Sequence, residues 1–270
     1  MLSSVLNGSL IAALRATDKD ADYRCPECKA PVILRKGKYR VAHFAHKIDE
    51  GCRYGEGMTE DHLLTQTQIF DVLDSNGFYC ELESRRFRGR RADVYAEIND
   101  ERVVFEVQHS QITPEEILSR NQFYSDNGCH VIWILTPGLF GKMRARCNPS
   151  KGIPLANWQI RINDIYGCVF IWWDSKLIAY QFDPAIRDSE FNRLTQEFEY
   201  VGEYQLKKTF DKIGYAEIDL IWGIKNRILI PFKDETFNTS CFGLSPENYA
   251  ADWKFPDKCY RWSDPFSVAI

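Results

Sequence analysis

The sequence predicts a mixed fold, part α+β and part α/β, whose central part runs helix, three strands, helix, strand (αβββαβ). Apolar residues recur at helical spacing between residues 59 and 76, and three short segments of strand character follow between 78 and 110. A second helical segment and the apolar run CHVIWIL complete the order. We expect three parts: a small N-terminal module at 1–55, this core at 56–145 and an α+β region at 146–270.

Length and composition bound the class of protein. With 270 residues and 44% hydrophobic residues, the chain is long enough to fold around its own core. No apolar run approaches the roughly 18 residues of a membrane span. The stretch MLSSVLNGSLIAALRA lacks the basic start and long apolar centre of a signal peptide, so we expect a cytoplasmic protein with no membrane partner.

Cysteine count and charge narrow the possibilities further. Nine cysteines are an odd number, which fits a reducing compartment and a few metal ligands better than a disulfide framework. The net charge of −4 means that any contact with nucleic acid must come from local basic patches.

The N-terminal module contains a candidate zinc site in YRCPECKAPVILRKGKYRVAHFAHK. Cys25 and Cys28 form a CxxC pair, and His43 and His46 follow a short hairpin. Two thiolates and two imidazoles are a tetrahedral set that Zn²⁺ favours in structural sites. The close HxxH spacing indicates a zinc knuckle rather than a finger with a recognition helix. Two alternatives stay open: Cys52 replaces one histidine as a ligand, or the four residues pack without metal.

The elements of the core follow from local signals. Thr59 is a suitable N-cap for the first helix, and Asn76-Gly77 ends it. The segments FYCELESRRF, RADVYAEI and RVVFEVQHS predict a three-stranded meander with a turn at Asn99-Asp100, and Thr113-Pro114 begins a second helix that runs to about Asp126.

The C-terminal region gives weaker signals. We expect a hairpin around residues 174–176, one or two amphipathic helices over 189–210, and a strand at 227–232.

Two acids and an amide in the meander are not explained by folding. Asp93 lies in the strand RADVYAEI, and Glu106 and Gln108 share one face of the next strand. If the two strands pair, Asp93 lies opposite the region of Glu106 and Gln108. Neighbouring carboxylates repel each other unless a cation lies between them, and their oxygens suit Mg²⁺ or Mn²⁺. Such a cation supplies what phosphodiester hydrolysis requires, a polarised phosphoryl oxygen and an acidified water.

The same residues resemble a known family. The D-x(12)-E-x-Q pattern in this frame is similar to the restriction-endonuclease-like, PD-(D/E)XK nuclease superfamily, and more closely resembles the CoiA-like competence-protein family. The resemblance covers about residues 20 to 140. Its features are Cys25, Cys28, HFAH at 43–46, Glu60, ADV at 92–94, FEVQHS at 105–110, Arg120 with Tyr124, and IWIL at 132–135.

This resemblance implies roles for individual residues. Asp93 and Glu106 match the metal-binding acids, and Glu60 resembles the additional acid from the first helix. Gln108 occupies the place of the superfamily's usual lysine, where it can orient a water but cannot stabilise a developing anion by charge. The resemblance also implies that Arg120 and Tyr124 line the site or contact a phosphate. We leave His62 and His109 outside the catalytic set, because single histidines more often serve packing.

The predicted function is metal-dependent hydrolysis of DNA. The run RRFRGRR supplies a basic patch for the phosphate backbone, with Arg85, Arg86, Arg88, Arg90 and Arg91. The resemblance implies a role in competence, recombination or DNA processing, and defence against foreign DNA is equally compatible. The alternatives are a nucleic-acid-binding module with an inactive site, and an adaptor that binds a protein partner. The C-terminal region could hold a homo-oligomer or partner contact.

Overall fold

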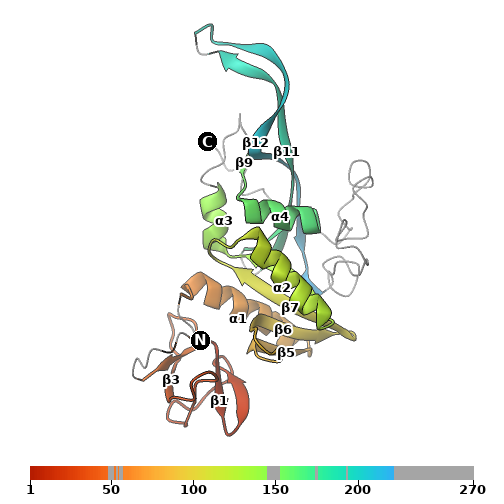
Figure 1. Ribbon diagram of the computed structural model, residues 1–270. Coiled ribbons are helices and arrows are strands. Elements are labelled where there is room, and N and C mark those ends of the chain that lie inside the picture. The colour runs from red at the N-terminus through yellow and green to blue at the C-terminus, as the bar shows by residue number, and fades with distance from the viewer. Residues whose placement is uncertain are drawn as a thin grey trace. The chain divides into compact units, whose positions relative to one another are not determined.

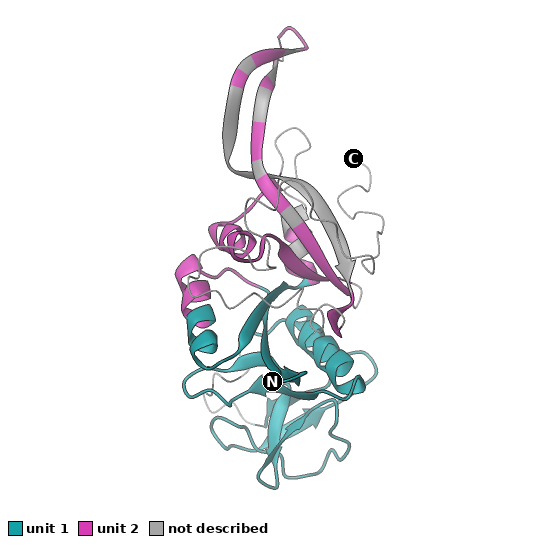
Figure 2. Cartoon of the chain, turned by 90° about the vertical axis from the view of Figure 1, so that its right-hand side faces the viewer, with its two compact units in different colours: residues 1–109, 121–136 teal, residues 110–120, 137–270 magenta. Residues whose placement is uncertain are grey.

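The computed structural model describes residues 1–47, 52, 54, 57–144, 153–173, 176–192 and 194–221. These residues fold as two compact units (Figure 2). The first unit contains residues 1–109 and 121–136, and the second contains residues 110–120 and those from 137 onward. Within the described residues, no helix is long and apolar enough to cross a membrane.

The first unit opens with two small antiparallel hairpins. Strands β1 (Ser3–Leu6) and β2 (Ser9–Ala12) form the first, and β3 (Val32–Arg35) and β4 (His43–His46) form the second. The second is the hairpin predicted between the two pairs of metal-ligand candidates. The buried Tyr23 and Phe44 rings lie 4.8 Å apart in the small apolar core shared by these strands.

Helix α1 (Glu60–Ser75) follows, as the sequence predicts. The Thr59 hydroxyl accepts a hydrogen bond from the His62 backbone N–H at 3.3 Å, so the predicted N-cap is confirmed. The helix packs along β5, β6 and β7 (Figure 1). Its buried stripe includes Ile69, Phe70 and Leu73 but begins with the polar His62 and Gln66. The apolar residues anchor the helix, and the two polar ones need another explanation.

The sheet of the first unit has the order β5 (Tyr79–Ser84), β6 (Ala92–Ile98), β7 (Glu101–Gln108), β8 (His130–Leu135). Strands β5, β6 and β7 form an antiparallel meander, and the turn at Asn99 and Asp100 has positive φ at both residues, as a tight hairpin requires. Strand β8 pairs parallel to β7 after helix α2 (Pro114–Asp126). The predicted order of helix, three strands, helix and strand is therefore found.

Glu83 joins the N-terminal hairpins to this sheet. Its side chain is fully buried, and Oε2 accepts hydrogen bonds from the Leu2 and Ser3 backbone N–H groups at 2.8 and 2.9 Å. The Ser3 and Tyr54 hydroxyls donate to the same oxygen at 2.9 and 3.0 Å. Glu83 has a φ of +50°, and the β5–β6 register steps past it from Leu82↔Val94 to Ser84↔Ala92. This local departure turns the carboxylate toward the N-terminal strand.

The strands of the second unit follow one another in the order β10, β11, β12, β9. Helix α4 packs on β10 through its buried face, which includes Trp158, Ile162 and Tyr166. The elements are α3 (Pro137–Arg144), β9 (Ile153–Pro154), α4 (Asn157–Tyr166), β10 (Val169–Trp173), β11 (Lys176–Asn192) and β12 (Glu197–Ile218). The predicted hairpin around residues 174–176 is found as β10 and β11.

The prediction of helices over residues 189–210 is wrong. This segment belongs to the long antiparallel pair of β11 and β12, in which Phe191 pairs with Phe198 and Ser189 with Tyr200. Residues 197–204, EFEYVGEY, alternate acidic and apolar residues over most of their length, which is strand periodicity. The strand predicted at 227–232 lies outside the described residues.

Replacement of Glu83 is expected to loosen the N-terminal hairpins. Glu83→Ala leaves two buried N–H groups and two hydroxyls without their acceptor, and should lower the free energy of unfolding by about 3 kcal/mol. Chemical denaturation measures the change. Asp71→Ala, on the exposed side of α1, is the control and should change stability by less than about 0.5 kcal/mol. Equal stability of the two variants would contradict the role given to Glu83.

Candidate functional site

A possible metal centre lies in the N-terminal part of the first unit. One donor atom from each of Cys25, Cys28, His46 and Cys52 lies within 4.8 Å of every other. The Cys28 Sγ and His46 Nε2 atoms are 3.3 Å apart, and the Cys25 and Cys52 sulfurs are 4.0 Å apart. The latter separation is about twice a disulfide bond length, so these thiols are free.

The ligand set differs from the predicted one at one position. The structure brings together Cys25, Cys28 and His46 as predicted, but Cys52 rather than His43 completes the group. Because side chains alternate along a strand, His43 and His46, three residues apart in β4, point to opposite faces. His43 Nδ1 lies instead 2.8 Å from the Val41 carbonyl oxygen. Cys52 is the alternative ligand that the sequence left open.

The local structure shifts the pKa values of two of the thiols in opposite directions. Hydrogen bonding from the backbone at Ala30, with help from His46 and the neighbouring cysteines, lowers the pKa of Cys28 to about 7. Burial raises the pKa of Cys25 to about 12. Three sulfurs and one imidazole in a compact group fit a tetrahedral metal ion, because a bound cation favours the thiolate form of each cysteine.

The candidate active site is centred on Asp93, near the start of β6. The Val107 backbone N–H donates to Asp93 Oδ2 at 2.9 Å, and His62 Nε2 lies 3.2 Å from the same oxygen. Burial by itself would raise the pKa of Asp93, but the His62 hydrogen bond and charge, the Val107 N–H and the Arg91 charge together lower it. Asp93 is therefore a buried carboxylate that stays ionised near neutral pH.

Glu106 and Gln108 lie on β7, beside Asp93. The register of β6 and β7 ends at Val94↔Phe105, and its continuation places Asp93 opposite Glu106. The Asp93 hydrogen bond to the Val107 N–H fixes its carboxylate at this part of β7. The Glu106 and Gln108 side chains are 1% and 8% exposed. The register thus points to one end of the strand pair for the three polar residues, and their common role at a site stays a prediction.

Three residues at this site were not in the predicted set. Gln66 Nε2 lies 2.9 Å from His62 Nε2, and the His109 ring stacks on the His62 ring with centroids 4.4 Å apart. Burial, followed by the charge of His62, lowers the pKa of His109. A signal existed in the sequence: His62 and Gln66 occupy positions i and i+4 of the apolar stripe of α1, where polar side chains are otherwise unexpected.

The remaining predicted residues have other positions or partners in the structure. Glu60 is exposed at the first position of α1. Arg120 forms an ion pair with Glu116 at 2.8 Å. The Tyr124 side chain is buried against Phe87, with ring centroids 5.1 Å apart. Their roles at the site stay predictions.

The arginine run makes many contacts within the first unit. Arg85 pairs with Glu27, and Arg86 pairs with Glu81 at 3.0 Å. Arg85 and Arg91 both lie over the Tyr54 ring, 5.1 and 4.7 Å from its centroid, and Arg90 lies 5.5 Å from the Phe123 centroid. Arg88 is exposed. Part of this charge therefore serves to join the cysteine module to the sheet.

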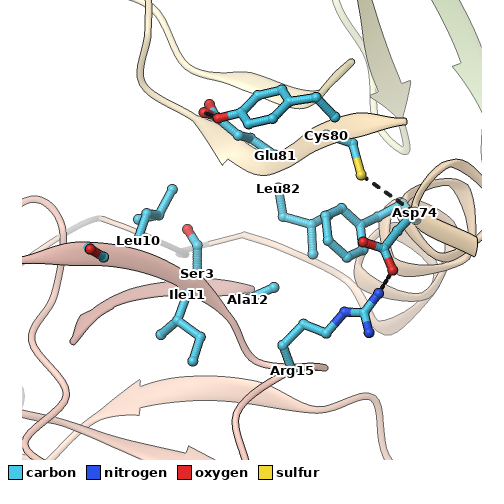
Figure 3. A pocket seen from close by; sticks show the side chains of 12 residues that line it. Ser3, Leu10, Ile11, Ala12, Arg15, Asp74, Cys80, Glu81 and Leu82 are labelled. Carbon is cyan, nitrogen blue, oxygen red and sulfur yellow. Dashed lines mark hydrogen bonds and ion pairs between the residues drawn. The ribbon is translucent and has the colours of Figure 1, made fainter. Parts of the chain in front are cut away.

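A cavity of about 540 Å³ is a separate feature of the first unit (Figure 3). It is bordered by β2, β5 and the last turns of α1, and the Arg15–Asp74 ion pair lies in its wall. None of the predicted site residues lines it. The lining residues are Ser3, Ser9, Leu10, Ile11, Ala12, Arg15, Phe70, Asp74, Tyr79, Cys80, Glu81 and Leu82.

Comparisons with known proteins match this arrangement of module and core. The family of competence protein CoiA N-terminal domains matches residues 6–55, and the family of CoiA nuclease-like domains matches residues 58–151. The chain is therefore a protein with a cysteine/histidine module ahead of a nuclease-like domain. It belongs to the CoiA-like family.

One curated relative is competence protein CoiA of Bacillus subtilis (strain 168). It is 27% identical to this chain over 137 residues. The matched part is 50% of this chain and 36% of the relative, so the chain spans little more than a third of the relative's length. No solved structure matches the chain significantly.

The composition of the metal centre can be tested by single substitutions. Cys52→Ser should reduce bound zinc from about one ion per chain to well below one, because only three ligands remain. His43→Gln should leave the zinc content unchanged, since His43 lies outside the group. Atomic emission on the purified proteins measures the metal. Loss of zinc in the His43 variant and its retention in the Cys52 variant would instead support the predicted set, in which His43 and not Cys52 is the fourth ligand.

The thiol reactivities should differ in the metal-free protein. A pKa of about 7 makes Cys28 largely thiolate at pH 8, whereas a pKa of about 12 leaves Cys25 protonated there. We expect iodoacetamide to alkylate Cys28 first and the difference to shrink below pH 6, where both are protonated. Mass spectrometry after timed alkylation measures the order, and faster reaction of Cys25 would be the contrary result.

Proposed function

We propose that the chain hydrolyses DNA phosphodiester bonds with a divalent cation held by Asp93 and Glu106. The observation that supports this function best is the burial of two neighbouring carboxylates at one end of β6 and β7. Burying two neighbouring acids is costly unless fixed donors or a cation compensate their charge. Both acids lie in the segment that matches the nuclease-like domain.

The residues fit a hard cation. Carboxylate oxygens are the ligands that Mg²⁺ and Mn²⁺ prefer, and the lowered pKa of Asp93 keeps that donor ionised. A bound cation would polarise a phosphoryl oxygen and make a coordinated water more acidic. Gln108, whose backbone carbonyl accepts a hydrogen bond from the Thr136 N–H at 3.0 Å, would hold a water or a substrate oxygen with its amide.

The proposed substrate and biological role rest on the name of a relative and on exposed basic residues. The competence name of the Bacillus subtilis relative supports DNA and a role in DNA uptake or processing. Arg85, Arg86 and Arg88 are exposed, and we assign their outer surfaces to phosphate contact. Glu60 and Arg120 remain proposed contributors from α1 and α2.

For the cysteine module we propose a structural zinc ion. Four protein donors leave no open position for a substrate, which is typical of structural rather than catalytic zinc. Tyr54 follows the ligand Cys52 by two residues and bonds to Glu83, so the metal would also fix the junction between module and sheet.

Cleavage of DNA by isosteric variants tests the nuclease function. Linear and circular DNA, single- and double-stranded, are incubated with Mg²⁺, Mn²⁺ or chelator. Wild type should cut only with metal, and Asp93→Asn or Glu106→Gln should lower the rate by about 100-fold or more, because each change removes a charged metal donor. Product formation on gels measures the rate.

Asp100→Asn is the matched control, because Asp100 lies exposed in the turn that joins the same two strands. It should cut like wild type. If wild type and Asp93→Asn are both inert on every substrate and bind DNA equally, the nuclease proposal is wrong and a nucleic-acid-binding module is favoured.

A further inference from the structure

The buried stripe of α1 begins with two polar side chains that its apolar packing does not require. His62 is 5% exposed and Gln66 is fully buried. His62 is the third residue of the helix, and its backbone N–H is bound by the Thr59 cap. Successive residues of a helix are rotated by about 100°, so His62 and the exposed Glu60 project in very different directions. The helix therefore presents an imidazole to Asp93.

The proton on His62 can be assigned from its surroundings. Nδ1 is buried and has no hydrogen-bond partner among the described residues. An ionised carboxylate can only accept a hydrogen bond, so the contact with Asp93 Oδ2 requires a proton on Nε2. From Nε2 it is donated to Asp93 Oδ2 at 3.2 Å.

Gln66 supports the same proton. Its amide lies 2.9 Å from His62 Nε2, and its Oε1 has no partner among the described residues. A half-turn of the amide exchanges its oxygen and nitrogen, which places an acceptor against the His62 N–H and removes the clash of two donors. The Nε2–H of His62 is then shared between Asp93 and Gln66, and the plane of the imidazole is fixed by both.

His109 fixes the other side of the ring. It stacks on His62 at an interplanar angle of 23°, and its Nε2 lies 3.0 Å from the Gly57 carbonyl oxygen. His109 directly follows Gln108 on the chain. His109, which follows β7, therefore contacts both the His62 ring and the segment before α1.

We infer that His62 is a positioning residue that holds the Asp93 carboxylate in one orientation, with Gln66 and His109 holding His62. Together with the Val107 N–H, it occupies Asp93 Oδ2 and leaves Oδ1 for a cation. The inference rests on the proposed function, because a cation site at Asp93 gives the orientation its purpose. Groups that orient a metal ligand commonly change metal affinity or activity by about 10- to 100-fold when they are removed.

The first test measures the tautomer without metal at the active site or substrate. In the zinc-loaded protein, long-range ¹H–¹⁵N spectra of the histidine side chains should show His62 protonated at Nε2. Asp93→Asn should shift the ¹⁵N signal of that nitrogen. Absence of a proton from Nε2, or a His62 signal that does not respond to the Asp93 change, overturns the inference.

The second test separates positioning from packing. His62→Phe keeps an aromatic ring against His109 but has no donor, whereas the amide of His62→Gln can place an N–H near the position of Nε2. Mn²⁺ affinity of the zinc-loaded proteins is measured by the electron paramagnetic resonance signal of free Mn²⁺. The Phe variant should bind Mn²⁺ at least about 10-fold more weakly, and the Gln variant should recover most of the loss. Asp71→Asn, exposed on the same helix, should bind like wild type.

Equal Mn²⁺ affinity in wild type, His62→Phe and His62→Gln overturns the inference, and so does a loss that His62→Gln does not recover. Failure of the nuclease proposal gives another pattern. The wild type then binds Mn²⁺ in a manner that depends on Asp93 but cuts no DNA. His62→Phe still binds Mn²⁺ more weakly than the wild type, and His62→Gln still recovers most of the loss. If Asp93→Asn leaves Mn²⁺ affinity unchanged, both ideas are overturned.

Discussion

The burial of the Asp93 carboxylate is the constraint on which the candidate site depends. A charge withdrawn from water must receive compensation from fixed donors, and here one comes from a backbone N–H of β7 and another from a side chain of α1. Helix α1 and strands β6 and β7 are therefore joined at one oxygen atom, Asp93 Oδ2. The apolar packing of α1 on the sheet holds the elements close, whereas this polar junction determines which residues of each element meet.

A second buried carboxylate, Glu83, joins the cysteine module to the same sheet. It collects backbone and hydroxyl donors from the N-terminal strand and from Tyr54. Arg85 and Arg91 cover the ring of Tyr54, and Arg85 also pairs with Glu27, between the two cysteines of the CxxC turn. Basic residues near an active site are readily assigned to nucleic acid from sequence alone. In this protein several of them serve to join the module to the sheet.

Local signals predicted the core well, because caps, tight turns and strand periodicity are properties of short segments. The Thr59 cap and the Asn99-Asp100 turn are examples, and the pairing of Asp93 with the Glu106 region followed from that turn. Choices that depend on distant partners were harder. The exclusion of His43 follows from strand alternation, which the sequence contained, but the recruitment of Cys52 depends on how the chain returns to the module. The long strands of the second unit were mistaken for helices because a charged segment with apolar residues at mixed spacing fits both patterns in part.

The hydrogen bonds of Glu83 also bear on how the chain folds. Leu2 and Ser3 precede their shared acceptor by 81 and 80 residues. During synthesis, the backbone of the N-terminal strand therefore remains incompletely satisfied until β5 has left the ribosome, even if the metal module has already closed. Contacts of such sequence separation are slow to form and leave a strand edge open in the meantime. The Leu2 and Ser3 N–H groups therefore find their acceptor only when the sheet is complete, not when the module closes.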